Sequence, residues 1–330
     1  MSEIKITALS EPHDLGEGPI WIEKDKALMY VDAFQGIVHR HFPDTGRHQT
    51  LCIEKEAGFR CVSIVIPVEG EPDLYIVTVG RCVGTVRWPV SSADQLTVKA
   101  NLLHVTDDHY PLNHFNDGKC DPRGRLWAGT KGHESSPGIC EMERGTLFRL
   151  DSQLELTHSG VDKVSISNGM AWSEDRKTFY YIDSPLQLIY AFNYDDDEGK
   201  IMQYSIFEDF PNTNEISKFW QKMLSNSNKG GYFWCFIRLK QVICIDPRKE
   251  GDILCTIEMP CSNITSVTFG GPNYSTLYVT TAFRYLKDEE RKATPEAGCT
   301  LAVTGLGVQG SPPISFKADS GKLKEKLNKN

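Results

Sequence analysis

The sequence lacks a hydrophobic run long enough to cross a membrane. Its longest apolar run, CVSIVIPV at residues 61–68, is far shorter than the roughly 20 apolar residues of a membrane-spanning helix. The first residues, MSEIKITALSEPHDLGEG, carry acidic and polar side chains where a secretory signal peptide needs an apolar core. We therefore expect a soluble, cytoplasmic protein.

Clustered cysteines and an excess of basic residues are also missing. The ten cysteines are scattered and form neither a CxxC motif nor a Cys/His cluster, so we expect reduced thiols that serve as small apolar residues. The net charge is -8. A nucleic acid or a membrane surface would favour a basic face, so the charge argues against both as partners.

No Pro-rich or Ser-rich linker divides the 330 residues. We therefore expect one domain over residues 1–330, with a short polar tail from about 317 to 330 that frays at its end. Two β-sandwich domains are the alternative arrangement, and the missing linker counts against them.

What the chain does contain is a repeat of short strands. PIWIEKDKALMYVDAF at residues 19–34 is echoed by MAWSEDRKTFYYIDSP at residues 170–185, and looser copies lie between and after them. Each copy has strands of β-branched and aromatic residues separated by Asp, Gly, Asn or Lys turns. The copies recur every 45 to 55 residues, roughly the length of one propeller blade. They begin near Pro19, Ser63, Lys119, Met170, Met223 and Val267. The sequence therefore predicts an all-β fold, a six-bladed β-propeller.

Three loops before predicted inner strands carry polar side chains next to a glycine. They are HDLGEGPIW with Glu17, NHFNDGKCD with Asn113, His114, Asn116 and Asp117, and SISNGMAW with Asn168. Such loops converge on the centre of a propeller, and their oxygen ligands suit Ca²⁺ or Mg²⁺. The alternative is that these Asn-Gly and Asn-Asp-Gly pairs are simply tight turns.

Several motifs resemble one known family. LGEGPIW, FNDGKCDPRGRLWAGT, SNGMAWSEDRKTFYYIDS, FGGPNYSTLYVTTA and VTGLGVQG are similar, in order and spacing, to the family of regucalcin (senescence marker protein), gluconolactonase and luciferin-regenerating enzyme. The resemblance runs from about residue 10 to 312 and is strongest for the insect luciferin-regenerating branch. It implies a propeller that holds one divalent metal and hydrolyses sugar lactones or related ester-like bonds. The implied metal is Ca²⁺, with Mg²⁺, Mn²⁺ or Zn²⁺ as alternatives.

The resemblance also implies roles for single residues. Family metal ligands correspond to Glu17 and Asn168, and substrate-contacting residues correspond to Asn116 and Glu134. His114 stands where many relatives have arginine, so it would bind substrate without a forked, permanently charged head. The implied partner is a small lactone-type substrate.

One stretch departs from both the repeat and the family. EISKFWQKMLSNSNKGGYFWCF, residues 215–236, stands where relatives carry a Pro-Asp-Gly loop whose Asp is both metal ligand and base. Counting forward from Ile216 puts Lys218 at the position of this Asp, and counting back from Trp234 puts Met223 there. Three explanations are open. The protein is a non-catalytic homologue that lost the loop, or a neighbour such as Glu215, Asn226 or Asn228 replaces the Asp, or the segment reflects a misread exon boundary. The catalytic residue is therefore unassigned.

Three functions compete at this point. The first is a metal-dependent lactonase or related hydrolase, weakened if the Asp is absent. The second is a propeller that binds calcium or a small ligand without turnover. The third is a protein-interaction scaffold, since a propeller fold does not by itself determine function.

Overall fold

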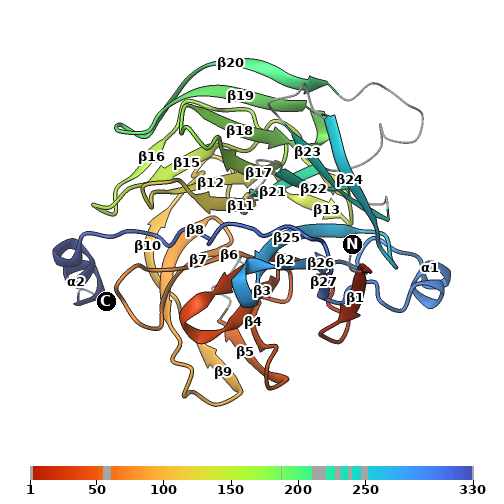
Figure 1. The fold of residues 1–330 in the computed structure, drawn as a ribbon. Coiled ribbons are helices and arrows are strands. Elements are labelled where there is room, and N and C mark those ends of the chain that lie inside the picture. The colour runs from red at the N-terminus through yellow and green to blue at the C-terminus, as the bar shows by residue number, and fades with distance from the viewer. Residues whose placement is uncertain are drawn as a thin grey trace.

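The computed structural model describes residues 3–54, 61–186, 188–209, 221–226, 232–236, 240–246 and 252–328, and for 207–209, 221–226, 232–236, 245 and 252 it describes the backbone alone. Within these residues the strands form five four-stranded sheets, one five-stranded sheet and one two-stranded hairpin. Figure 1 shows the sheets around a common centre, in a β-propeller arrangement. The all-β prediction is confirmed.

Four of the four-stranded sheets each add their strands in chain order. From the inner strand outward, the first two are β6 (Val62–Pro67), β7 (Leu74–Val79), β8 (Cys82–Arg87) and β10 (Asn101–Val105), then β11 (His114–Cys120), β12 (Leu126–Lys131), β15 (Leu147–Leu150) and β16 (Leu156–His158). The next two are β17 (Ser167–Trp172), β18 (Thr178–Asp183), β19 (Leu188–Asp195) and β20 (Lys200–Asp209), then β21 (Gln221–Asn226), β22 (Tyr232–Phe236), β23 (Gln241–Asp246) and β24 (Asp252–Glu258). The hairpin is β13 (Glu134–Ser136) and β14 (Ile139–Cys140).

The remaining four-stranded sheet joins the two ends of the described chain. It contains β25 (Ile264–Gly270), β26 (Thr276–Thr281) and β27 (Leu301–Thr304), and its outermost strand is β1 (Lys5–Ala8). β1 pairs antiparallel with β27 from Lys5 opposite Thr304 to Ala8 opposite Leu301. This pairing closes the ring of sheets.

The five-stranded sheet corrects the expectation of six equal four-stranded blades. It contains β2 (Gly16–Ile22), β3 (Ala27–Asp32), β4 (Ile37–Phe42), β5 (Arg47–Ile53) and β9 (Gln95–Val98). Regular four-stranded blades therefore number five rather than six. β9 pairs parallel with β5 because the edge of β5 offers unpaired backbone groups, to which the chain after β8 returns. Arg47 and Asp94 form an ion pair beside this junction.

The inner strands contact one another in sequence order, and we call them the inner ring. β2 contacts β6, β6 contacts β11, β11 contacts β17, β17 contacts β21, β21 contacts β25, and β25 returns to β2. The second strands β3 and β7 are buried along their whole length, because neighbouring sheets cover both of their faces. This explains why ALMYVD and LYIVTV read as nearly continuous apolar runs.

The C-terminal tail is more ordered than expected. After β27 the chain crosses to β6, where the Phe316 backbone N–H donates to the Pro67 carbonyl at 2.9 Å. Residues Ser320–Asn328 then form α2, and Leu323 is buried in the largest hydrophobic cluster. Among the described residues, the other helical segments are α1 (Asp288–Ala293) and the 3-10 turns η1 (Glu23–Asp25), η2 (Ser184–Leu186) and η4 (Pro272–Tyr274). In the described part of the chain, no helix has both the length and the apolar character to span a membrane.

Candidate metal and substrate site

A polar side chain lies near the start of every inner strand except β21. The five residues are Glu17 in β2, Ser63 in β6, Asn116 in β11, Asn168 in β17 and Thr265 in β25. Each lies at or next to a register shift between its strand and the second strand of the sheet. Such bulges turn a side chain out of the regular alternation, so we call these five residues the ring positions.

Three ring positions donate hydrogen bonds to the next sheet. Ser63 Oγ donates to the Phe115 carbonyl and Asn116 Nδ2 to the Ser167 carbonyl, both at 2.7 Å. Thr265 Oγ1 donates to the Gly16 carbonyl. Each acceptor immediately precedes another ring position. The hydrogen bonds therefore hold the inner strands at a common level around the centre.

Asn116 and Asn168 are in direct contact. Asn116 Nδ2 donates to Asn168 Oδ1 at 3.1 Å, and Asn168 Nδ2 donates to Ser184 Oγ at 2.7 Å. Both hydrogens of the Asn116 amide are thus used, and its Oδ1 is the atom that can accept from a ligand. Two residues singled out from the sequence therefore meet.

Glu17 occupies the corresponding position across the ring, and its two glycines are needed there. Gly18 has a φ of 53°, in the left-handed region that favours glycine. A Cβ on Gly16 would come within 2.9 Å of the Thr281 carbonyl oxygen. Glu17 Oε2 accepts from the Gly18 N–H at 3.1 Å. The Gly-Glu-Gly sequence is thus a close-packed strand start that presents a carboxylate.

Two equivalent aspartates support the loops before Glu17 and Asn168. Asp32, at the end of β3, accepts from the backbone N–H groups of Asp14 and Leu15 at 3.1 and 3.2 Å. Asp183, at the end of β18, accepts from those of Ser165 and Ile166, both at 2.9 Å. Burial raises the pKa of both carboxyls. Each aspartate lies 15 residues after the ring position that it supports.

Glu134 lies in a buried ion-pair cluster with Lys131 and Arg284. Lys131 Nζ is 3.0 Å from Glu134 Oε2, and the two side chains are 4% and 2% exposed. Arg284 Nε lies 3.6 Å from Glu134 Oε1, and Arg284 also pairs with Asp14 at 2.9 Å. Burial alone would raise the pKa of Glu134, but the charge and hydrogen bond of Lys131 lower it below its usual value. Glu134 is therefore held ionised.

His114 is a buried neutral imidazole beside this cluster. Burial and then the charge of Lys131 lower its pKa well below 6.5. The ring hydrogen bonds to the backbone of Leu112, and Nε2 has no protein partner. The Phe34 ring joins the two groups, since its centre is 6.0 Å from that of His114 and 4.1 Å from the Arg284 guanidinium carbon.

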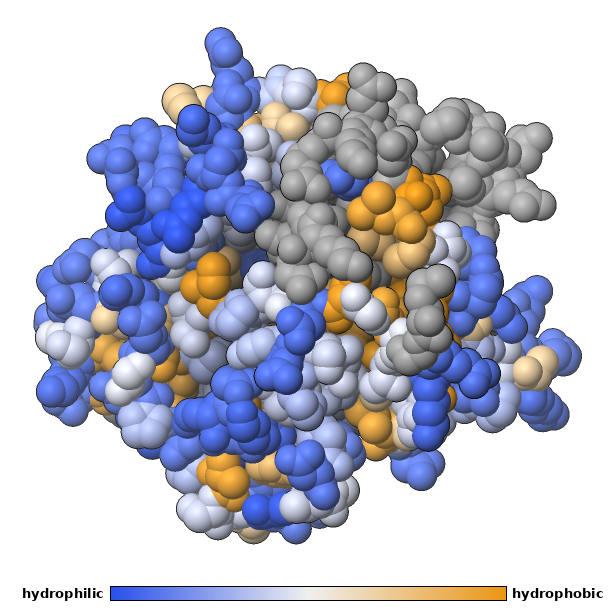
Figure 2. Space-filling model, viewed as in Figure 1, coloured by the Kyte–Doolittle hydropathy of each residue, from blue (hydrophilic) through white to orange (hydrophobic). Residues whose placement is uncertain are grey.

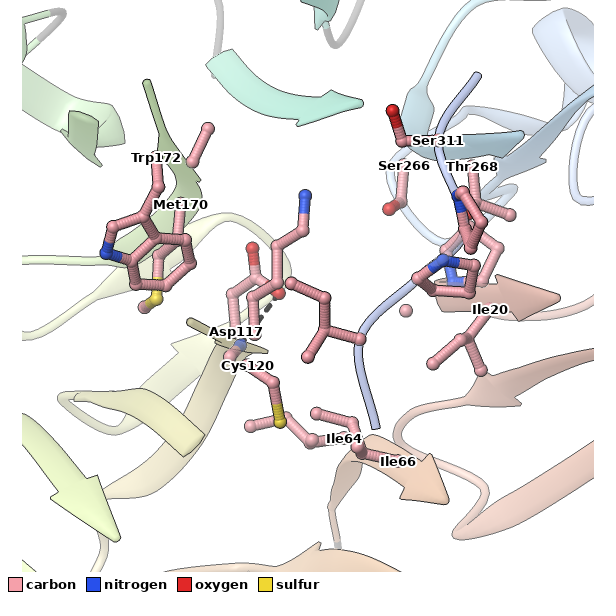
Figure 3. Close-up of a pocket in the computed structure, with 18 of the residues that line it drawn as sticks. Ile20, Ile64, Ile66, Asp117, Cys120, Met170, Trp172, Ser266, Thr268 and Ser311 are labelled. Atoms are coloured by element: carbon pink, nitrogen blue, oxygen red, sulfur yellow. Dashed lines mark hydrogen bonds between the residues drawn. The ribbon is translucent and has the colours of Figure 1, made fainter. Parts of the chain in front are cut away.

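A cavity of about 320 Å³ lies farther along the inner strands. Ser63, which is a ring position, and Gly18 and Asp117, which each follow one, line it, so it begins at the ring positions. Its walls are mostly apolar, and the segment 311–314 also lines it. Figure 3 shows Ile20, Ile64 and Ile66, then Asp117 and Cys120, then Met170 and Trp172, with Ser266, Thr268 and Ser311 opposite. The cavity therefore combines a mostly apolar wall with polar side chains such as those of Asp117, Ser266 and Thr268.

The donor atoms at the ring fit a hard cation in kind. Glu17 offers carboxylate oxygens and Asn168 an amide oxygen, which Ca²⁺ and Mg²⁺ prefer. Across the described residues, however, no three His, Cys, Asp or Glu side chains are grouped so as to hold a metal ion. Lys218 lies outside the described residues. Met223 lies in β21 directly before the register shift, as Glu17 and Asn168 do in their strands.

Sequence reasoning missed Arg284, Ser184 and the two smaller ring positions. The motif AGTKGHE contains Lys131 three residues before Glu134, a spacing that could have suggested the ion pair. Ser63 and Thr265 lie in apolar strand sequences without a flanking Asn-Gly or Gly-Glu-Gly signal. Arg284 lies in the turn after β26, and nothing in its local sequence points toward Glu134.

Comparison with known proteins agrees with the motifs. The family model for the SMP-30/Gluconolactonase/LRE-like region matches residues 15–283. Regucalcin of Xenopus laevis is 35% identical over 326 residues, which cover 96% of this chain and 99% of that protein.

Solved structures give the same result. A luciferin-regenerating enzyme has a TM-score of 0.85 at 28% identity, over 96% of this chain and 100% of that chain. A calcium-binding regucalcin from Agrobacterium tumefaciens has a TM-score of 0.80 at 21% identity, over 94% and 96%, and supports the fold. By its family match, its curated relative and its fold, the chain belongs to the SMP-30/gluconolactonase/LRE-like family.

Proposed function

We propose that this protein is a divalent-cation-dependent hydrolase of sugar lactones or related ester-like bonds. The observation that carries the proposal is the contact between Asn116 and Asn168 at the starts of neighbouring inner strands. It joins a residue proposed to bind substrate to one proposed to bind the cation. Regucalcin and gluconolactonase relatives supply the substrate class. We also propose that the five-stranded sheet serves as the sixth blade, since β2 contacts β6 and β25 on either side.

Glu17 and Asn168 are the residues proposed to hold Ca²⁺, or Mg²⁺, Mn²⁺ or Zn²⁺ in its place. When bound, a divalent cation supplies polarisation of the lactone carbonyl and lowers the pKa of a coordinated water. Glu17 would contribute the negative charge. Asn168 would contribute a neutral oxygen whose direction is controlled by Asn116 and Ser184.

Substrate hydroxyls would be recognised by groups with an unused polar atom. Asn116 Oδ1 and the unpartnered Nε2 of neutral His114 each accept a hydrogen bond from a hydroxyl. Arg284 provides the forked cation that His114 lacks, and both contact Phe34. Glu134 is proposed to act mainly as a positioning residue, because it pairs with Lys131 and Arg284.

The register of β21 favours a second candidate, a propeller that binds calcium or a small ligand without turnover. Met223 is aligned with Glu17 and Asn168, and a thioether neither accepts a proton at neutral pH nor ligates a hard cation well. The catalytic base is unassigned for the same reason.

Lactone hydrolysis tests the first function against the second. D-Glucono-1,5-lactone would be followed with a pH indicator, using the full chain with added Ca²⁺, with chelator, and with Ca²⁺ restored. We expect slow hydrolysis above the uncatalysed rate that chelator removes and metal restores. Calcium-dependent thermal stabilisation with no hydrolysis for any of the four cations would instead identify the binding-only propeller.

A further inference from the structure

Two cysteines lie opposite each other in the sheet that contains β21. β23 and β24 pair antiparallel, and Cys244 is the Cα partner of Cys255. Directly opposed residues of antiparallel strands have Cα atoms roughly 4.5–5.5 Å apart, inside the 4.4–6.8 Å range of disulfides. On its other side Cys244 faces Phe233 of β22, so Cys255 is the thiol aligned with it. The pair needs little backbone movement to cross-link.

The two thiols differ in their access to solvent. Cys244 is 4% exposed and packs in a hydrophobic cluster with Val242 and Ile257. Cys255 is exposed on β24, the outermost strand of the sheet. A hydrophobic patch lies in the region of β23 and β24 in Figure 2, in keeping with exposed Ile253 and Leu254. A small reagent can therefore reach Cys255 before Cys244.

The interaction between the two thiols also makes Cys255 more reactive than Cys244. A hydrogen bond between them lowers the pKa of Cys255 to about 7 and, together with burial, raises the pKa of Cys244. The lowered pKa favours the thiolate of Cys255, the form that reacts with oxidants. Burial raises the pKa of Cys61 to about 12 and of Cys261 to about 11.

We propose that Cys255 and Cys244 form a reversible oxidation site that a hydroperoxide converts into a cross-strand disulfide. The Cys255 thiolate attacks one oxygen of hydrogen peroxide, the O–O bond breaks, and protonation of the leaving hydroxide gives a sulfenic acid and water. The Cys244 sulfur then attacks the Cys255 sulfur, the S–O bond breaks, and a second water leaves with the thiol proton. Two thiols are oxidised and one peroxide is reduced to two waters.

The strand geometry allows the second step. A register shift follows Cys244 in β23, and such a bulge lets the strand bend locally. The reaction uses groups remote from the ring positions, because β23 and β24 are the two outer strands of their sheet. The oxidation site is therefore independent of the proposed hydrolysis.

Peptide mapping of the full-length protein tests the site. Trypsin cleaves after Arg248, so Cys244 and Cys255 fall in different peptides, but Cys255 shares its peptide with Cys261. The reduced protein would be treated with hydrogen peroxide, alkylated, digested without reductant and analysed by mass spectrometry. We expect a linked peptide pair that dithiothreitol separates. The variant Cys261→Ser is the matched control and should give the link, whereas Cys255→Ser and Cys244→Ser should not.

Two further measurements cover the chance that a variant misfolds. Cys244→Ser should leave a Cys255 sulfenic acid that dimedone traps. In the unaltered protein at pH 7, iodoacetamide should label Cys255 about tenfold faster than Cys140, whose pKa burial raises. Labelling of Cys255 no faster than of Cys140, or a link to Cys235 or Cys261 instead of Cys244, would overturn the proposal.

Discussion

The amide of Asn116 donates across the boundary between two sheets to the side-chain oxygen of Asn168, at 3.1 Å. The same amide also donates to the carbonyl just before Asn168, at 2.7 Å. One side chain therefore positions both the backbone and the side chain of a neighbouring inner strand. Loss of this amide would leave groups of the buried residues Ser167 and Asn168 without their donor.

Asn116→Ala should lower both stability and activity. Two acceptors lose their donor, at a cost of about 1–3 kcal/mol in the free energy of unfolding. Lactone hydrolysis should fall further than stability explains. Thermal melting and the hydrolysis assay measure the two effects, and Asn193→Ala, at an exposed position in β19, is the control. Equal activity of Asn116→Ala and Asn193→Ala would remove Asn116 from the site.

Glu17→Gln should weaken divalent-cation binding more than the same change elsewhere. The substitution keeps the shape of the side chain and removes the negative charge that attracts a dication. We expect at least about a tenfold rise in the Kd for Ca²⁺, equivalent to about 1.4 kcal/mol. Calorimetric titration measures it, with Glu54→Gln at an exposed position as control. An unchanged affinity would exclude Glu17 as a ligand.

Glu134→Gln should destabilise the protein by about 3–5 kcal/mol, because it leaves Lys131 as a buried charge without its partner. The double variant Lys131→Met/Glu134→Gln should recover much of that loss. The lowered pKa of Glu134 adds a pH dependence of definite sign. Its contribution is present above the unfolded-state pKa near 4.3 and is lost as the pH falls through the folded value. Melting temperatures of the unaltered protein and of Glu134→Gln would be compared from pH 7 to 3. If both proteins lost stability in parallel as the pH fell, the buried ion pair would be refuted.

Met223→Asp should increase cation affinity and lactone hydrolysis together. The aspartate would restore a charged oxygen at a position aligned with Glu17 and Asn168. Replacing residues 217–230 with a short loop that carries Pro-Asp-Gly would be a poorer test of the missing aspartate, because it would delete β21. A positioned acid–base group typically contributes about 10²–10⁴-fold, so even a partial gain is measurable. If neither quantity changes, Glu215 becomes the next residue to replace.

His13→Gln should make the protein less sensitive to mild acid. Burial and the nearby His48 lower the pKa of His13 to about 4. The unfolded chain therefore binds a proton near pH 6.5 while the folded chain does not, and stability falls between pH 6.5 and 4, by about 3 kcal/mol. Glutamine can still bond to the Tyr30 hydroxyl, which is 3.1 Å from His13 Nε2. The difference in melting temperature between pH 7 and 5 should shrink in the variant; an undiminished difference would assign the acid sensitivity to other groups.

The repeat could be predicted from sequence because each hairpin is local. The Gly-Glu-Gly, Asn-Asp-Gly and Asn-Gly signals marked Glu17, Asn116 and Asn168, and the structure puts all three near register shifts. What could not be predicted depends on contacts between distant segments. β9 returns to β5, Arg284 reaches Glu134, and Leu323 and Leu327 anchor a Lys-rich helix. None of these leaves a periodic pattern in its own stretch of chain.

The pairing of β1 with β27 has a consequence for synthesis. Nearly the whole described chain separates the two strands, so β1 leaves the ribosome long before its partner exists. Until then the edge of β1 and the side of β2 that meets β25 have no partner. A nascent chain therefore carries an open ring whose two ends can pair with other chains, and chaperones have their greatest opportunity to act before the last sheet is made.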